Sequence, residues 1–185
     1  MATNLLTLLM NQASKKLNLS QNRFNLTGVD FSQFSEVEEL DLSNCRISEL
    51  PKGIEYMPRL KKLNLSGNKK LNMSKTLFKL SELKSLRELN ISGCGIVELP
   101  AEIYHLRSLK QLNLDHNPIN SLSANTVRQL PESLEFYSCV GCRFQEISNA
   151  IKALPRLNKI MLDHEVYDDL VRINLYNKNV QLMVA

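Results

Sequence analysis

One phrase, L-x-x-L-x-L-x-x-(N/C)-x-(L/I/F), recurs along almost the whole chain and limits what the chain can fold into. Complete copies run from Val37 to Ile47 and from Leu109 to Ile119. The frames lie about 23 residues apart, with two slightly longer steps, and begin at Ser14, Val37, Leu60, Leu86, Leu109, Leu134 and Leu157. One unit of this length cannot bury its own apolar side. The repeat therefore predicts coils that stack and bury it between neighbours.

Each copy of the phrase indicates a strand followed by a returning segment. Side chains of a strand alternate between its two faces, so positions four and six point into the core while positions three, five and seven point outward. The phrase resembles the leucine-rich repeat, in which each coil is a strand plus a helix or 3₁₀ turn. This resemblance implies an α/β leucine-rich-repeat solenoid. The solenoid would be a curved right-handed superhelix of about seven repeats, with a parallel sheet on its concave wall.

The returning segments carry a second pattern, which runs over residues 48–60 and again over residues 97–109. Proline suits the first turn of a helix, because it lacks an N–H that this turn does not need. Ile54 and Met57 lie three residues apart and are predicted to face inward together. The Leu-Pro form resembles the intracellular repeats of Ras-suppressor-like and scaffold proteins. Leu130-Pro131-Glu132-Ser133-Leu134 resembles the start of a bacterial effector repeat.

The unbroken repeat predicts a single domain. Its parts are an N-terminal cap over 1–13, repeats over 14–164 and a C-terminal cap over 165–185, which together make one domain over 1–185. The apolar stretch Asn4–Met10 is too short to span a bilayer and follows no basic residue, which favours a capping helix over an export signal. A helix over Val166–Ile173 and a final strand over Val180–Val184 are expected to cover the other end.

All four cysteines fall on positions that the repeat explains. Cys45, Cys94 and Cys142 occupy position nine, and Cys139 occupies a core position. The C-x-x-C pair lacks the βαβ context of a redox motif and the further ligands of a zinc site, so we predict buried, reduced cysteines. Since neither end carries a cysteine-rich cap, we predict a cytoplasmic location, or the host-cell cytosol for an exported effector.

The outward positions change character along the chain. In the first four copies, position five is Asn or Asp and position seven is Ser, an arrangement in which stacked side chains satisfy one another. In copies five to seven, Phe136, Val140 and Met161 face outward by the same register, and such an apolar group can anchor a protein partner. The predicted polar rim of this site consists of Gln111, Asp115, His116, Lys159, Asp163 and His164. In the alternative interpretation, the C-terminal cap folds back over these residues.

No catalytic constellation is recognisable in the sequence. It has no Gly-rich phosphate loop, no Gly-x-Ser-x-Gly elbow and no His-Glu-x-x-His motif. Two Leu-Asp-His triplets, at 114–116 and 162–164, lie two strands apart. Their backbones are then about 10 Å apart, which disfavours a shared metal ion. We predict no enzymatic activity, no cofactor and no metal.

Charge is banded along the chain although its net value is only +4. Nine basic residues lie between Arg59 and Arg87, with Glu82 as the single acid. Glu38 and Glu39 fall between lysine pairs of the neighbouring copies, and opposite charges on adjacent strands are mildly stabilising. We therefore predict an ion-pair ladder. The alternatives are an acidic protein partner or, disfavoured by the scarcity of aromatic residues, nucleic acid or an anionic membrane.

These patterns predict a monomeric, non-enzymatic interaction module. Its expected partner is a protein, which binds the concave face mainly through repeats five to seven; this function follows from the family resemblance. Two alternatives remain open. One is a secreted bacterial effector that engages host signalling proteins, and the other is a regulator of a small GTPase.

Overall fold

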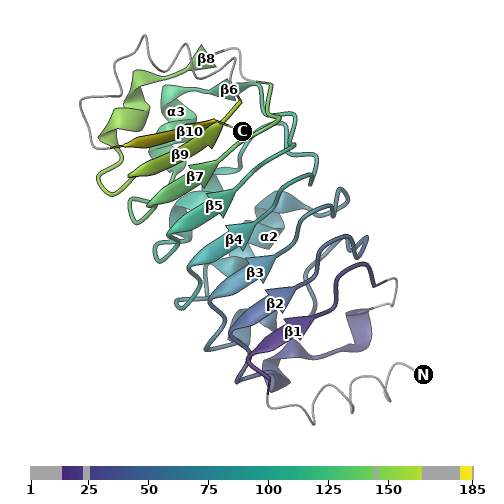
Figure 1. The fold of residues 1–185 in the computed structure, drawn as a ribbon. Helices are drawn as coiled ribbons and strands as arrows, with labels where there is room; N and C mark the ends of the chain where they lie inside the picture. Colours follow the sequence, from purple (N-terminus) through teal and green to yellow (C-terminus); the bar gives the residue numbers. More distant parts are fainter. Residues whose placement is uncertain (1–13, 23–25, 144–145, 164–179, 185) are drawn as a thin grey trace.

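The computed structural model describes residues 14–22, 26–143, 146–163 and 180–184, which form a curved stack of coils (Figure 1). Its main sheet has eight parallel strands. In spatial order these are β1 (Lys16–Asn18), β2 (Glu39–Asp41), β3 (Lys62–Asn64), β4 (Glu88–Asn90), β5 (Gln111–Asn113), β7 (Phe136–Ser138), β9 (Lys159–Leu162) and β10 (Gln181–Val184). The predicted solenoid with a parallel sheet is confirmed.

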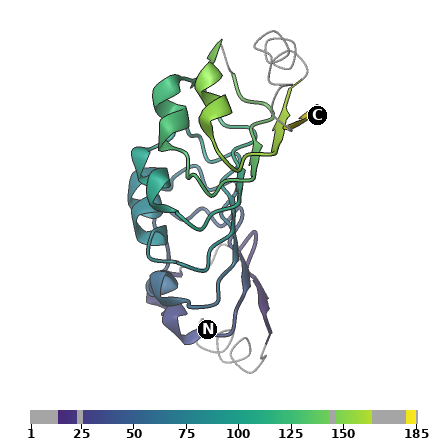
Figure 2. The ribbon, with the colours of Figure 1, turned by 90° about the vertical axis from the view of Figure 1, so that its left-hand side faces the viewer.

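The returning segments form a second layer behind the sheet (Figure 2). Its helical elements are η1 (Leu26–Gly28), η2 (Phe31–Gln33), η3 (Ile54–Tyr56), α2 (Met73–Leu80), η4 (Ala101–His105), α3 (Ala124–Gln129) and η5 (Asn149–Ala153). A separate two-stranded parallel sheet pairs β6 (Ser121–Leu122) with β8 (Glu146–Ile147). The predicted final strand is β10, which pairs with β9. The capping helices predicted near both termini lie outside the described residues.

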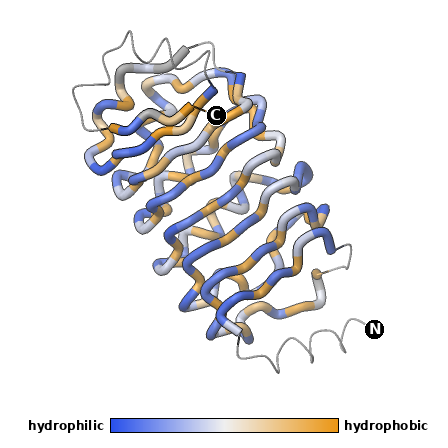
Figure 3. Tube along the Cα trace, viewed as in Figure 1, coloured by the Kyte–Doolittle hydropathy of each residue, from blue (hydrophilic) through white to orange (hydrophobic). Residues whose placement is uncertain are grey.

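Strand register follows the repeat. Lys16 lies opposite Glu39, and Glu39 lies opposite Lys62, so equivalent positions of successive copies stack. Leu40 and Leu42, at positions four and six, are buried as expected. A slip of one residue would turn these leucines to solvent, which holds the register. Figure 3 shows the resulting alternation of apolar and polar residues along the strands.

Short helical turns close the core from the other side. Ile54 and Met57 are both buried, as their spacing predicts. The longest returning element, α2, begins after Asn72, whose side chain accepts a hydrogen bond from the Lys75 N–H at 3.0 Å. This N-cap satisfies one of the free donors of the first turn. Apolar side chains of the helix, such as Leu77, are buried in the core.

A left-handed residue follows each strand of the main sheet from β1 to β7. The residues with positive φ at this position are Gln21, Asn44, Gly67, Gly93, His116 and Gly141. Gly141 is needed for a second reason, because a Cβ there would collide with the imidazole of His116 in the preceding coil. The sharp turn brings position nine back beneath the strand.

Position nine joins each coil to the one before it. The fully buried Asn117 donates from Nδ2 to the Ile91 carbonyl at 3.0 Å and to the Leu114 carbonyl at 2.8 Å. Its Oδ1 accepts from the Ile96 N–H at 3.0 Å. The thiol of Cys94 makes the equivalent contact with the preceding coil, at 3.3 Å from a carbonyl oxygen. Burial raises the pKa of this thiol above its ordinary value.

The prediction of four reduced cysteines is wrong for one pair. Cys139 and Cys142 form a disulfide, with Cα atoms 5.6 Å apart, whereas Cys45 and Cys94 are free and buried. The reason is local, because a C-x-x-C that spans positions six and nine places both sulfurs inside the same turn. Cα atoms at this separation can be bridged without moving the backbone.

Candidate protein-binding face

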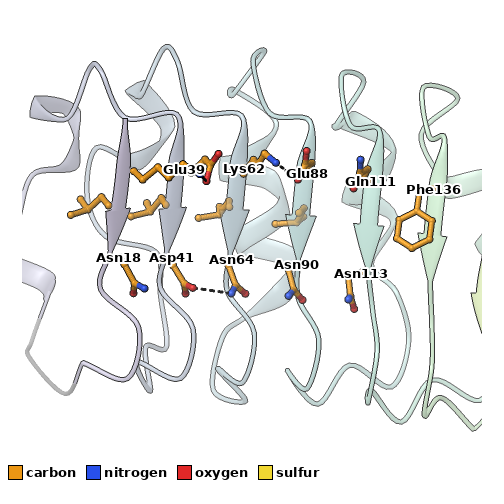
Figure 4. A pocket seen from close by; sticks show the side chains of 15 residues that line it. Asn18, Glu39, Asp41, Lys62, Asn64, Glu88, Asn90, Gln111, Asn113 and Phe136 are labelled. Carbon is orange, nitrogen blue, oxygen red and sulfur yellow. Dashed lines mark hydrogen bonds and ion pairs between the residues drawn. The ribbon is translucent and has the colours of Figure 1, made fainter. Parts of the chain in front are cut away.

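The concave side of the sheet holds an open hollow of about 450 Å³, which we call the concave hollow. It extends over β1 to β5 and ends at Phe136 in β7 (Figure 4). Two rows of side chains, from positions three and five of the repeat, line it. They are Lys16, Glu39, Lys62, Glu88, Gln111 and Phe136 in one row, and Asn18, Asp41, Asn64, Asn90 and Asn113 in the other.

The position-three row changes from charged to uncharged along the sheet. Lys16 pairs with Glu39 at 2.9 Å, and Lys62 pairs with Glu88 at 3.0 Å. The hydrogen bond to Glu88 raises the pKa of Lys62 above its ordinary value. The next side chain of the row carries no charge, and Phe136 ends it. Cross-strand ion pairs on a partly exposed surface contribute little stability, so their main effect is to neutralise this wall.

The position-five row has a fixed side-chain orientation. The Oδ1 of Asn90 accepts a hydrogen bond from the Ser92 N–H at 3.0 Å, and the Oδ1 of Asn113 accepts from the Asp115 N–H at 2.8 Å. Asp41 uses its own Oδ1 in the same way. Such turns between a side chain and the backbone two residues on explain why Asn and Asp recur here. The amide nitrogens are left for other partners.

The structure separates the sequence-predicted site residues into three groups. Phe136 and Gln111 line the concave hollow. Lys159 and Met161 continue the same two rows on β9, opposite Phe136 and Ser138. Phe136 and Met161 are half-buried rather than fully exposed. The other predicted residues lie in the turns after the strands, apart from His164, which is outside the described residues.

The two predicted rim carboxylates are bonded within the solenoid. Asp115 accepts from the Ser138 hydroxyl at 2.6 Å and from the Val140 N–H at 2.8 Å. Asp163 accepts from the Gly141 N–H at 3.0 and 2.8 Å. Each carboxylate therefore connects its own coil to a neighbouring one. These bonds occupy oxygen atoms that the predicted rim would offer to a partner.

The sequence interpretation missed the concave hollow, because it treated the outward positions of the first copies as scaffold. A signal was present. Lysine and glutamate alternate at position three, and asparagine recurs at position five, so both rows could be written from the repeat frame. What the frame does not show is that these rows line an open hollow that is continuous with Phe136.

The predicted ion-pair ladder is confirmed at the strands. Glu38 lies between Lys15 at 3.0 Å and Lys61 at 2.7 Å, and these two hydrogen-bonded cations, Lys61 first, lower the pKa of its carboxyl to about 2. Arg59 pairs with Glu36. Among the described residues, Lys75 on α2 has no such carboxylate partner. Lys61 and Lys62 of the basic band are therefore neutralised at the strands, whereas Lys75 on the convex side is not.

Other functions would require a metal site or a membrane-spanning helix. Within residues 14–22, 26–143, 146–163 and 180–184, no group of three or more His, Cys, Asp or Glu side chains is arranged to hold a metal ion. In the same part of the chain, no helix is both long and apolar enough to cross a membrane.

Sequence comparison identifies the repeat. Models of the leucine-rich repeat match residues 35–96, 58–119 and 108–135, which together cover more than half of the chain. The CD180 antigen of Mus musculus is 42% identical over 60 residues, which are 32% of this chain and 9% of that protein. The chain thus spans less than a tenth of the length of this relative.

Solved structures share the architecture. A chain of the TLR13–ssRNA13 complex superposes with a TM-score of 0.67 and 25% identity, over 80% of this chain and 21% of that chain. A chain of the mouse RP105/MD-1 complex superposes with a TM-score of 0.62 and 26% identity, over 92% of this chain and 26% of that chain. Human 5T4 superposes with a TM-score of 0.60 and 21% identity, over 92% of this chain and 79% of that chain. This similarity shows likeness of fold alone.

Proposed function

Because the chain belongs to the leucine-rich-repeat family, whose members generally mediate protein–protein interactions, we propose that it binds a protein partner on its concave wall. One observation carries this proposal. The concave hollow is open, and its two rows of side chains point away from the core that holds the coils together. A solenoid that presents such a continuous curved surface is suited to a partner that extends over several coils.

The C-terminal half of this wall is the proposed anchor. Phe136 and Met161 lie in the adjacent strands β7 and β9, and both are half-buried. Aromatic and methionine side chains are enriched at the centres of interfaces, where they lose water on binding. The charged part of the wall, from Lys16 to Glu88, is neutralised internally and serves as the complementary surround.

A crosslinking pull-down of the full chain from its native cells, read by mass spectrometry, tests the proposal. Phe136→Asp should weaken capture of the partner by about tenfold or more, the effect expected of an interface anchor. Tyr56→Asp is the matched control, because Tyr56 is 71% exposed on the convex side. Equal loss of capture from both variants would reject the concave wall as the binding face.

Two narrower hypotheses concern the class of partner. Capture of host signalling proteins would support an exported effector, for which Leu130–Leu134 is the motivating segment. Capture of a small GTPase whose nucleotide turnover changes on binding would support a regulator, as the Leu-Pro repeats suggest. A secretion assay tests the effector hypothesis. The nucleotide turnover of the GTPase, measured with and without the protein, tests the regulator hypothesis.

A cytoplasmic location remains our proposal, supported by the free thiols of Cys45 and Cys94. The Cys139–Cys142 disulfide counts against it, because such bonds persist in oxidising compartments and are rare in the cytosol. Fractionation of the native cells should recover the full chain together with cytosolic marker proteins. Recovery of the chain in a secreted or luminal fraction would contradict the proposal.

A further inference from the structure

We propose that the occupant of the concave hollow is an extended polypeptide segment, and that Asn90 and Asn113 hold it by donating from their side-chain amides to its backbone carbonyls. This inference rests on the proposed function and specifies the chemistry of the partner. It assigns a binding role to residues whose recurrence in the repeat is otherwise explained by the turn that each one makes.

The side-chain amides of Asn90 and Asn113 have a fixed orientation. In each, Oδ1 accepts a backbone N–H of its own turn, at 3.0 Å for Asn90 and 2.8 Å for Asn113. The bond fixes which end of the amide is which, because only oxygen can accept. Each Nδ2 therefore faces away from the turn as a donor. Among the described residues, none accepts a hydrogen bond from either Nδ2, whereas the Nδ2 of Asn64 donates to Asp41 at 3.2 Å.

These two donors are neighbours on the concave wall. Asn90 and Asn113 lie opposite each other on β4 and β5, and both line the concave hollow (Figure 4). Neighbouring strands are about 4.8 Å apart, so the two amides form a short row across the sheet. A ligand seated there shields them from water. A shielded donor without an acceptor is costly, so the row favours ligands that bring acceptors to it.

The charges that line the concave hollow favour an uncharged ligand. Lys16 and Lys62 are each paired with a glutamate of the adjacent strand, and Asp41 adds a negative charge. No cation of the lining is therefore free to neutralise a phosphate backbone, the interaction that dominates nucleic-acid binding. Uncharged acceptors fit better. The peptide carbonyl is a strong neutral acceptor, and every residue of a polypeptide carries one.

An extended segment suits these donors better than a helix does. A helix uses its carbonyls within its own backbone, whereas an extended segment keeps them available. Phe136 closes the hollow one strand beyond Asn113 and is half-buried, so it offers an apolar contact to a side chain of the same segment. Donors to the backbone with an adjacent apolar contact are the combination that binds extended peptides, where hydrogen bonds give affinity and pockets give specificity.

Asp41 shows which substitution would remove the amide donor and keep the turn. Asp41 occupies the equivalent position on β2, and its Oδ1 accepts from the Ser43 N–H at 2.8 Å, as the asparagines do in their turns. Asn90→Asp should therefore keep the turn and exchange the donor for a carboxylate that repels a carbonyl. Asn158→Asp is the control, because it adds the same charge at an exposed position outside the hollow.

The probes are linear peptides selected on the wild-type protein from a random library displayed on phage, then synthesised with fluorescein and measured by fluorescence anisotropy. Asn90→Asp and Asn113→Asp should each weaken binding by about tenfold or more, and Asn158→Asp by less than about twofold. Thermal melts establish that all three variants are folded. A glycan array probed with the wild-type protein serves as the competing assay.

Unchanged peptide affinity in Asn90→Asp and Asn113→Asp overturns the inference. So does a failure to select peptides when the wild type still captures an intact partner, since the partner is then recognised as a folded surface. Selective binding of glycans that is lost in the two variants overturns it too. Each of these outcomes leaves the proposed function standing. Loss of capture by Tyr56→Asp as great as by Phe136→Asp would reject the proposed function instead.

Discussion

The N-terminal and C-terminal halves of the sheet use one scaffold in different ways. In β1 to β4, the outward charged residues pair with one another across the strands, as Lys62 does with Glu88. In β5, β7 and β9, outward positions are mostly uncharged or apolar, and carboxylates of the turns bond to neighbouring coils, as Asp115 does with Val140. The charged row of β1 to β4 is neutralised across the strands, whereas the amides of Asn90 and Asn113, on β4 and β5, and the ring of Phe136 remain available. The difference supports the proposed binding surface from β4 to β7.

The largest expected effect tests whether the two halves share one interior. Asn68 makes the same contacts as Asn117, donating to the Leu42 and Leu65 carbonyls at 2.9 and 2.8 Å. Alanine at either position leaves buried backbone groups unpaired and should lower the free energy of unfolding by about 3 kcal/mol or more. Urea denaturation measures this loss in the free energy of unfolding. Clearly unequal losses would mean that the halves differ inside as well as outside.

A milder substitution calibrates this result. Cys94→Ala should cost only about 1 kcal/mol, because the thiol makes one weak hydrogen bond to the preceding coil. A loss as large as that of Asn68→Ala would show that filling the turn matters more than satisfying its backbone groups.

The next effect concerns the turn at Gly141, in the second half. Gly95→Ala should cost about 1 kcal/mol from its positive φ alone, because a Cβ there meets open space. Gly141→Ala adds a collision with the His116 ring, and we expect about 2–3 kcal/mol from the two terms together. Chemical denaturation of the two variants gives the difference. His116→Gly combined with Gly141→Ala should recover most of it, and no recovery would refute the collision.

A smaller effect of opposite sign is expected in the core of β7. Tyr137 is buried, and its hydroxyl has no hydrogen-bond partner among the described residues. Burial raises the pKa of this phenol. Tyr137→Phe removes the unpaired group and should raise the free energy of unfolding by about 1 kcal/mol. Thermal and urea denaturation measure the gain. A loss of stability would reveal a bond to the hydroxyl.

The smallest effect belongs to the charged half. The pKa of Glu38 lies at about 2 in the folded protein, below the ordinary value of 4.5, because Lys61 and Lys15 bond its ionised form. Its contribution is therefore complete above pH 4.5 and is lost as the pH falls toward 2. Melting temperatures of the wild type and Glu38→Gln should converge across this interval. A constant difference would show that the pair contributes no net stability.

Much of the fold could be predicted because the repeat ties burial to position. Once the frame is known, Leu40 and Leu42 must face inward, Asn68 must enter the turn, and each strand must stack on the equivalent strand before it. The ion pairs around Glu38 followed from the same frame, since equal positions in adjacent copies become neighbours.

The candidate site could be predicted less completely than the fold. The frame placed Asp115 and Asp163 on the outward side, but it did not show that their oxygens bond to atoms of adjacent coils. It also treated Asn90 as scaffold, because the turn explains an asparagine without reference to its free nitrogen. Local rules assign one role to each residue, and a second role becomes visible only when its neighbours are in place.

By itself, the sequence determined the solenoid, its register, its apolar core and the ladder of charges, since each depends on spacing along the chain. The tertiary structure decided which of the outward groups remain available. It showed the open hollow along the strands, joined Cys139 to Cys142, and committed Asp115 to the next coil. These outcomes depend on distances between atoms of adjacent coils. The repeat gives the order of the coils but not these distances.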